Sequence, residues 1–302
     1  MMAFPAKKRK NLAWQLHLML LPGILLILVF SYFPLAGITI AFKEFYPALG
    51  IWGSPWVGLE NFEYMFLLPD TPQILWNTLR IALLKMFFNF PVPIVVALML
   101  NEVSISGLKR TVQTVVYLPY FISWVILSGI IIDLFAREGI INQFLGLFRA
   151  EPVFFLGDNR YFTSMLVLTD VWKNFGYGTV VYLAAITGVD SSLYESAIID
   201  GANRWKQTLH ITLPSIAPII MLLMILNMGN VLNAGFDQIF NLYSPLVYPS
   251  ADIIDTFVYR ISMIEANYSL GTAVGLLKSI VSFILIVGSY TIANKYSDYT
   301  VF

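Results

Sequence analysis

Long apolar runs separated by polar segments are the dominant pattern of this chain. Six of these runs are near the ~20 residues that an α-helix needs to cross a bilayer. They cover residues 16–42, 74–100, 111–135, 161–187, 214–240 and 270–294. The pattern predicts an all-α membrane protein with six transmembrane helices. We expect residues 1–302 to form a single transmembrane domain.

The composition supports this class. The 302 residues are 58% hydrophobic and 12% charged, whereas a soluble domain has about 25% charged residues. A net charge of zero argues against a nucleic-acid partner. The chain has no cysteine, which excludes thiolate metal sites, and its two histidines have no metal-ligand partners nearby in the sequence. We therefore expect no metal site.

Lysine and arginine are distributed unequally between alternate loops. If both termini lie on one side, the loops and tails of that side carry nine of them and those of the other side carry five. The cluster Lys7-Lys8-Arg9-Lys10 precedes the first run, and no small-residue cleavage site follows that run. We interpret the run as an uncleaved first span. Because basic residues favour the cytoplasmic side, both termini and the loop at residues 188–213 are predicted to be cytoplasmic.

The loop at residues 188–213 has helical patterning on both sides of a single glycine, Gly201. Glycine takes a left-handed conformation at no steric cost, so Gly201 can end one short helix and turn the chain into the next. Two short amphipathic helices at a membrane surface form a knob suited to a partner protein. The residues at helical spacing are Leu193, Ala197, Ile198, Trp205, Leu209 and Thr212.

This loop resembles the coupling loop, or EAA loop, of the inner-membrane permeases of ATP-driven, binding-protein-dependent importers. The family pattern is Glu-Ala-Ala, three residues, Gly, nine residues, then Ile-x-Leu-Pro. It occurs here as Glu195-Ser196-Ala197, Gly201 and Ile211-Thr212-Leu213-Pro214, with every spacing kept and with Ser196 in place of one alanine. Further elements are similar to the carbohydrate branch of the family, in the same order: Val57–Phe62, Asn77-Thr78-Leu79, Leu118-Pro119 and Gly139–Asn142.

The resemblance implies a permease subunit of a heteromeric ABC importer for a sugar or oligosaccharide in a bacterial plasma membrane. It also implies the partners: a second permease, two ATP-binding subunits and an extracytoplasmic solute-binding protein. The loop would lie in a cleft of an ATP-binding subunit. Asp200 and Arg204, four residues apart, either brace the turn or remain a solvated pair. The coupling residues implied are Glu195, Ser196, Ala197, Asp200, Gly201, Ala202, Arg204, Leu213 and Pro214.

The sequence contains no recognisable nucleotide site. A phosphate-binding loop needs glycines, a lysine and a Ser or Thr at fixed spacing. The nearest string, from Gly271 to Ser279, has the wrong spacing and lies in an apolar run. Gly271 and Gly275 instead predict a contact between helices through small residues. We expect this chain to bind no cofactor, with ATP and Mg held by the partner subunits.

Polar side chains inside the fifth run point to function because they are costly in a membrane. They recur at intervals of three, three and four, which places them along one face of the predicted helix. The first lies about 20 Å along the helix from Pro214, near the middle of a bilayer. Amides suit sugar hydroxyls, and the alternative is hydrogen bonding between helices. These residues are Asn227, Asn230, Asn233 and Asp237.

Ionisable residues lie in the other runs. Asp170 and Lys173 are three apart and are predicted to form a structural ion pair. The excess of basic groups favours either a cavity that accepts an acidic saccharide, such as a uronate oligosaccharide, or basic side chains that pair outside the pathway. Tyr177 either stacks on sugar rings or packs. With the fifth run, the predicted pathway residues are Lys85, Asp170, Lys173, Tyr177 and Lys278.

A secondary active transporter of a polar solute is the alternative function. Such carriers typically contain broken helices related by an internal repeat, and the sequence indicates none. An ATP-binding subunit that copurifies with the chain would decide between the two.

Overall fold

The computed structural model describes residues 6–148, 151–228 and 232–296. These residues form helices and one isolated β-bridge, between Lys43 and Trp56, and they contain no β-strand. The all-α prediction is therefore confirmed for the described residues. The chain divides into two compact units, residues 1–67 with 258–276 and residues 68–257 with 277–302.

The first unit begins with one long helical segment. Helix α1 spans Ala6–Ile27 and continues through a π-helical turn at Leu28–Tyr32 into a 3-10 helix at Phe33–Phe42. Two short helices follow, α2 at Gly50–Gly53 and α3 at Glu60–Leu67. Most side chains between Trp14 and Phe42 are exposed although they are apolar, as expected for a helix that faces lipid or a partner helix.

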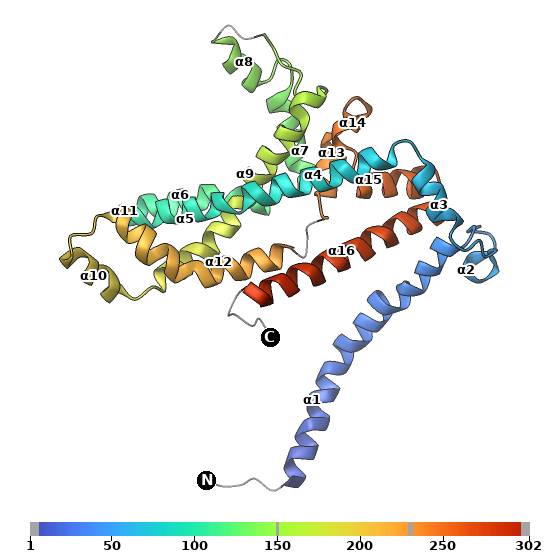
Figure 1. The fold of residues 1–302 in the computed structure, drawn as a ribbon, viewed down its shortest axis with the longest axis horizontal. Coiled ribbons are helices and arrows are strands. Elements are labelled where there is room, and N and C mark those ends of the chain that lie inside the picture. The colour runs from blue at the N-terminus through green and yellow to red at the C-terminus, as the bar shows by residue number, and fades with distance from the viewer. Residues whose placement is uncertain (1–5, 149–150, 229–231, 297–302) are drawn as a thin grey trace. The chain divides into compact units, whose positions relative to one another are not determined.

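The second unit is built around the long helix α9, Asn159–Thr187. It packs against α4 (Thr71–Asn89), α5 (Pro91–Glu102), α6 (Ser106–Phe121) and α12 (Leu213–Met228) (Figure 1). One half of α9 contributes Phe162 and Leu166 to a buried apolar cluster, and the other half contributes Leu183 and Ile186 to a second cluster. Burial of these apolar surfaces holds the helices together.

Shorter elements complete the second unit and lead into the last helix. They are α7 (Trp124–Phe135), α8 (Ile140–Gly146), α10 (Ser191–Ile199), α11 (Arg204–Gln207), a π-helical turn (Thr208–Thr212), α13 (Phe236–Leu242), a 3-10 turn (Pro245–Val247), α14 (Tyr248–Ala251), α15 (Ile254–Tyr259) and a second π-helical turn (Arg260–Ile264). The last helix, α16, spans Tyr268–Tyr296 and agrees with the sixth predicted run.

Among the described residues, four helical segments are long and apolar enough to cross a membrane: Trp14–Phe42, Thr71–Glu102, Arg204–Asn227 and Tyr268–Gly288. A fifth candidate is the pair Ser106–Phe121 and Trp124–Gly146, which is bent by 106°. The third predicted run is therefore a broken helix rather than a straight one. The chain leaves α6 after Pro119 through the extended residue Ile122, and the Ser123 side chain then caps α7 by accepting from Ile126 N at 3.4 Å.

The prediction of one helix over residues 214–240 is wrong. Helix α12 ends at Met228 and α13 begins at Phe236. Gly235 between them has a φ of +91°, a left-handed conformation that side chains disfavour and glycine accepts. The third and the fifth predicted runs are therefore both interrupted.

Three asparagines of the motifs outside the coupling loop fasten loops to helices. Asn61 Nδ2 donates to Ala41 O at 2.9 Å and to Lys43 O at 3.1 Å. Asn77 Nδ2 donates to three carbonyls, those of Tyr248, Pro249 and Asp252, at 3.2–3.4 Å. Asn142 Nδ2 donates to Ala136 O and Val153 O, both at 2.9 Å. These bonds add to backbone bonds that two of the carbonyls already accept, from Asp252 N to Tyr248 O at 3.0 Å and from Gly139 N to Ala136 O at 2.9 Å.

The predicted contact through Gly271 is confirmed, and the one through Gly275 is not. A methyl group on Gly271 would overlap Ser262 Oγ. Around Gly275 an added Cβ would find no atom within 4 Å. Only Gly271 is therefore required to be small by its neighbours.

Candidate functional site

The first candidate site is the elbow at residues 190–214, which begins with a capped helix. Asp190 has an extended backbone, and its Oδ1 accepts a hydrogen bond from Ser192 N at 2.9 Å. A carboxylate there satisfies a free N–H group and complements the positive end of the helix dipole. The hydrogen bonds from the backbone and side chain of Ser192 hold the pKa of Asp190 below its ordinary value.

Helix α10 ends at Ile199, and the chain leaves it through a Schellman motif whose left-handed residue is Gly201. Ala202 N donates to Ala197 O at 2.8 Å, and Gly201 N donates to Ile198 O at 3.0 Å. Gly201 has a φ of +75°, which is the left-handed residue that this motif needs. The space around a Cβ on Gly201 is open, so backbone conformation and not crowding demands glycine. The predicted turn at Gly201 is confirmed.

The residues after the turn are tied back to it. The Asn203 side chain caps the next helix by accepting from Lys206 N at 2.9 Å. Gln207 Nε2 donates to Ala202 O at 2.9 Å. The hydroxyls of Tyr194 and Thr212 lie 2.9 Å apart and join α10 to the helix after the turn. These bonds make the elbow a defined, stiff structure.

The predicted second short helix is not a separate element. Helix α11, the π-helical turn and α12 are continuous from Arg204 to Asn227. The elbow therefore consists of one short helix and the first turns of a long apolar helix. This arrangement joins the turn at Gly201 directly to a candidate span, with Leu213 and Pro214 inside the helix.

The elbow exposes apolar side chains that its own chain does not cover. Helix α10 has no buried residue, and Ile199 and Trp205 are 86% and 69% exposed. Leu193, Ile198 and Leu209 are exposed on the same segment. Contiguous exposed apolar residues next to polar ones mark an interaction surface. Glu195 and Ser196 are exposed with them.

The proposed brace between Asp200 and Arg204 is not formed. Residues 201–203 interrupt the helix between them, so the two side chains do not share one helical face. Arg204 Nη1 instead lies 3.3 Å from Glu102 Oε2, in an exposed ion pair with the end of α5. An exposed pair of this kind adds little to stability.

The second candidate site lies around the break in the fifth run. Asn227 is exposed near the end of α12, Asn233 is exposed in the segment between α12 and α13, and Asp237 is exposed in the first turn of α13. Asn230 lies outside the described residues. The prediction that these side chains follow one helical face is wrong, because α12 ends before Asn233.

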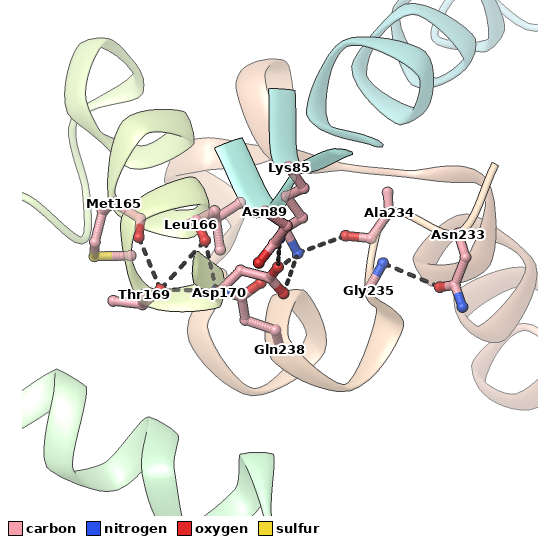
Figure 2. Close-up of polar contacts among 10 residues, drawn as sticks. All are labelled: Lys85, Asn89, Met165, Leu166, Thr169, Asp170, Asn233, Ala234, Gly235 and Gln238. Atoms are coloured by element: carbon pink, nitrogen blue, oxygen red, sulfur yellow. Dashed lines mark hydrogen bonds and ion pairs between the residues drawn. The ribbon is translucent and has the colours of Figure 1, made fainter. Parts of the chain in front are cut away.

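A buried network of polar groups fastens this break to α4 and α9. Lys85 Nζ lies 3.3 Å from Asp170 Oδ1 and donates to Ala234 O at 2.7 Å and to Gln238 Oε1 (Figure 2). Asp170 Oδ2 accepts from Asn89 Nδ2 at 2.7 Å. The predicted ion pair between Asp170 and Lys173 is therefore wrong, since Lys85 is the partner of Asp170.

Lys173 binds the end of α6 instead. Its ammonium group donates to Pro119 O, Tyr120 O and Ile122 O at 3.2, 2.9 and 2.5 Å. A cation at the carboxyl end of a helix complements its dipole. Lys173 thus stabilises the break between α6 and α7.

Aromatic rings lie around the break between α6 and α7. Lys173 Nζ lies 5.8 Å from the ring centroid of Tyr120 and 5.5 Å from that of Trp124. Tyr177, which is 56% exposed, stacks on Tyr120 with ring centroids 4.7 Å apart. Exposed aromatic faces beside a polar break suit sugar rings, which present apolar C–H faces and polar edges.

Lys278 has an anionic partner. Its Nζ lies 2.5 Å and 2.7 Å from the two carboxylate oxygens of Asp255. Two of the three predicted pathway lysines are thus paired with aspartates, and the third binds carbonyls. The excess of positive charge within the spans is smaller than the sequence suggested, and Arg80 is exposed.

Sequence reasoning missed Asn89 and Gln238, which complete the buried network. Gln238 is fully buried, and its Nε2 donates to Leu166 O at 2.8 Å and to Thr169 Oγ1 at 2.7 Å. A signal was present: Asn89 lies four residues after Lys85, on the same helical face. Gln238 is also a polar residue in an apolar run.

A third feature is a cavity of about 730 Å³ in the first unit, between the end of the first long helix and the start of α16. Its charged lining residues are all acidic: Glu44, Glu60, Glu63 and Glu265. Tyr46, which also lines it, donates to Glu44 Oε1 at 2.6 Å, and this bond raises the pKa of the Tyr46 hydroxyl above its ordinary value. The cavity is suited to basic or amide groups.

The chain is similar to one protein-family model and to several known proteins. The model described as "Binding-protein-dependent transport system inner membrane component" matches residues 89–297. Protein LplB of Bacillus subtilis (strain 168) is 44% identical over 94% of this chain and 89% of LplB. The polygalacturonan/rhamnogalacturonan transport system permease protein YteP of the same organism is 41% identical over 98% of this chain and 94% of YteP.

Two crystal structures are similar in sequence and fold. A chain of a bacterial ABC transporter involved in the import of the acidic polysaccharide alginate is 36% identical, with a TM-score of 0.89 over 96% of this chain and 99% of that chain. A chain of the bacterial alginate ABC transporter in complex with alginate pentasaccharide-bound periplasmic protein is 35% identical, with a TM-score of 0.89 over 98% of this chain and 99% of that chain.

Proposed function

This chain belongs to the family of binding-protein-dependent transport system inner membrane components, and we propose that it forms part of the translocation pathway of an ATP-driven importer for an acidic oligosaccharide. It is a transmembrane permease of the bacterial inner membrane. Both units of the chain act together as one permease domain in this proposal, with six spans and both termini in the cytoplasm.

We propose that the elbow at residues 190–214 couples this chain to the ATP-binding subunits. Its apolar side chains are exposed while its backbone is fixed by two caps and a Schellman motif. A stiff projection that continues into a span transmits a displacement, whereas a loose loop would absorb it. Closure of two ATP-binding subunits, which bind and hydrolyse ATP with Mg, would thus move α12. Glu195, Ser196, Ala197, Gly201 and Ala202 form the contact surface in this proposal.

The proposed sugar-binding groups lie at the two broken spans. Asn227 and Asn233 offer amides at the fifth run, and Tyr177 offers an exposed aromatic face beside Lys173 at the third. Asn230 and Asp237 are also proposed to bind sugar, because both belong to the series of polar residues in the fifth run. Breaks at membrane depth free backbone groups, which in transporters line the substrate path. A second permease would complete the pathway.

The proposal of an acidic substrate is supported more by the similar proteins than by the charged side chains within the spans. YteP is named for polygalacturonan and rhamnogalacturonan, and the similar crystal structures belong to an alginate transporter. Within the spans Lys85 and Lys278 are neutralised by aspartates, which leaves Lys173 and Arg80 as cations without a carboxylate partner in the described residues. Arg80 is exposed, whereas Lys173 is buried and its ammonium group donates to three carbonyls.

The acidic cavity of the first unit is the proposed contact for an extracytoplasmic solute-binding protein. It lies beyond the carboxyl end of the first span, which the basic cluster at Lys7–Lys10 orients outward in this proposal. A structure of the alginate transporter includes a periplasmic protein loaded with a pentasaccharide. Basic or amide side chains of such a partner would pair with Glu60 and Glu63.

Reconstitution with the partner subunits tests this function. The complex, with its ATP-binding subunits and loaded binding protein, should take up a labelled uronate oligosaccharide only when ATP is present. Unlabelled uronate oligosaccharides should compete with it, and neutral oligosaccharides of equal length should compete poorly. Equal competition by both would remove the acidic specificity, and uptake driven by an ion gradient without ATP would contradict the importer itself.

A further inference from the structure

The break in the fifth run has a buried carbonyl that the helices leave unpaired. Gly235 is the N-cap of α13, and the first backbone bond of that helix runs from Ile239 N to Gly235 O at 3.1 Å. The Ala234 carbonyl precedes it, and Ala234 is fully buried. An unpaired carbonyl in an apolar environment is costly. Lys85 Nζ reaches it from α4 at 2.7 Å.

The ammonium group of Lys85 uses all of its donors in this place. Its three acceptors are Ala234 O, the Gln238 side-chain oxygen and Asp170 Oδ1, and an ammonium group has three protons. Two of the acceptors belong to the break and α13, and one belongs to α9. Asp170 is held in turn by Asn89, and Gln238 by Thr169 (Figure 2). The geometry of the break therefore depends on one side chain of α4.

Gly235 is fitted to this lysine. A Cβ on Gly235 would lie 2.6 Å from Lys85 Nζ, and the φ of +91° disfavours any side chain. The backbone N–H of Gly235 donates to Asn233 Oδ1 at 3.2 Å. In the segment 232–235, Ala234 thus binds Lys85, and the next residue, Gly235, fixes the exposed amide of Asn233. Ala234 C=O and Gly235 N–H belong to the same peptide unit, so a change at Lys85 reaches the Asn233 side chain through that single unit.

We propose that Lys85 is a positioning residue that holds the segment 232–235 so that the Asn233 amide faces the transport pathway. Asp170 balances the charge that this task requires, and it is not itself a sugar-binding group. This inference deepens the proposed function, since it assigns a role within the same pathway. This role differs from that of Asn77, which fastens a loop to α4.

A thiol-accessibility experiment tests the position of the segment without any sugar. The chain contains no cysteine, so Asn233→Cys gives a single reactive site whose labelling by N-ethylmaleimide is followed by the mass of this chain in the assembled complex. The rate is compared between the parent and Lys85→Met/Asp170→Asn, which removes both charges and keeps both side-chain sizes. We expect the rate to change by about tenfold or more, because a segment that loses its anchor opens locally.

Two controls keep the result specific. Glu138→Cys, on an exposed loop of the second unit, should be labelled at the same rate in both backgrounds. Asp158→Asn/Arg160→Gln removes an ion pair at the exposed start of α9, where Asp158 is the N-cap, and should leave the Asn233→Cys rate within about twofold, as surface changes do. A rate at Asn233→Cys that stays within about twofold in the Lys85 variant would overturn the proposal. So would failure of that variant to assemble, since Lys85 would then act in folding.

Uptake kinetics give the second readout. With the same paired variant, the KM for the saccharide should rise by about tenfold to hundredfold, as misplacement of a binding group does. A lower maximal rate at unchanged KM would contradict a positioning role. If the parent complex takes up no saccharide, the proposed function fails while the thiol experiment still decides the role of Lys85.

Discussion

Lys85 Nζ lies 3.3 Å from Asp170 Oδ1, and this ion pair joins α4 to α9 in the interior of the second unit, where the two side chains are only 8% and 12% exposed. Buried charges are stable only as a pair, because either one alone keeps its cost of desolvation. The pair therefore links two helices that are far apart in the sequence to the break between α12 and α13.

The two charges should be strongly non-additive in stability. Lys85→Met alone leaves Asp170 unpaired and should lower the free energy of unfolding by about 3–5 kcal/mol. Lys85→Met/Asp170→Asn removes both charges and should cost clearly less than the single change. Thermal unfolding of the detergent-purified complex measures this. A paired variant as unstable as the single one would show that the ion pair is not the source of the effect.

The turn at Gly201 should be required for coupling. Gly201→Pro loses the N–H that donates to Ile198 and cannot adopt the φ of +75°. We expect the variant to assemble, to retain basal ATP hydrolysis and to lose uptake. Gly201→Asn is the matched control, because asparagine accepts the left-handed conformation and should keep most of the uptake. Full uptake by the proline variant would exclude a role for this turn.

The cap of α10 should depend on a charged Asp190. Because the pKa of Asp190 lies below its ordinary value, its contribution to stability is complete above the ordinary pKa of aspartate and is lost as the pH falls through the lowered value. Hydrogen exchange of amides 191–199, corrected for the intrinsic rate at each pH, should show loss of protection only in this acidic range. Asp190→Ala should lack the protection at neutral pH, and Asp190→Asn should keep it at every pH. Equal protection in the alanine variant would contradict the cap.

Helix α6 should tolerate no side chain at Gly176 of α9. A methyl group there would overlap the backbone oxygen of Val116, and backbone cannot move as a flexible side chain can. We expect Gly176→Ala to destabilise the protein by about 1–3 kcal/mol. Gly129→Ala is the control, since no atom lies within 4 Å of an added Cβ there. Thermal unfolding compares the two, and equal midpoints would show that α6 and α9 separate without cost.

The features that could be predicted from the sequence are local ones. A glycine between two patterned segments indicates a helix end, and the Schellman motif at Gly201 follows from residues within five positions of it. The apolar runs likewise predict the first and last long helices, because hydropathy needs no knowledge of neighbours. The spacing of the coupling loop also led to the family that the comparisons show.

The features that could not be predicted depend on distant partners. Helical spacing indicates that Asp170 and Lys173 are neighbours, but it does not reveal that Lys85 reaches Asp170 from another helix. The break before Gly235 was hidden for the same reason. An apolar run with a few amides looks continuous, and nothing within the run indicates that a lysine on α4 binds a carbonyl at the interruption. Polar residues that satisfy freed backbone groups mark such breaks, and their partners emerge only in the fold.

The contact between the elbow and an ATP-binding subunit is the central claim, and crosslinking tests it most directly. Glu195→Cys provides a single thiol in this chain, and a short bifunctional maleimide–amine reagent is applied to the assembled complex in inverted and right-side-out vesicles. The account predicts a crosslink from residue 195 to an ATP-binding subunit, and labelling by an impermeant thiol reagent from the cytoplasmic side alone. Labelling from the outer side, or no crosslink to an ATP-binding subunit in an active complex, would contradict it.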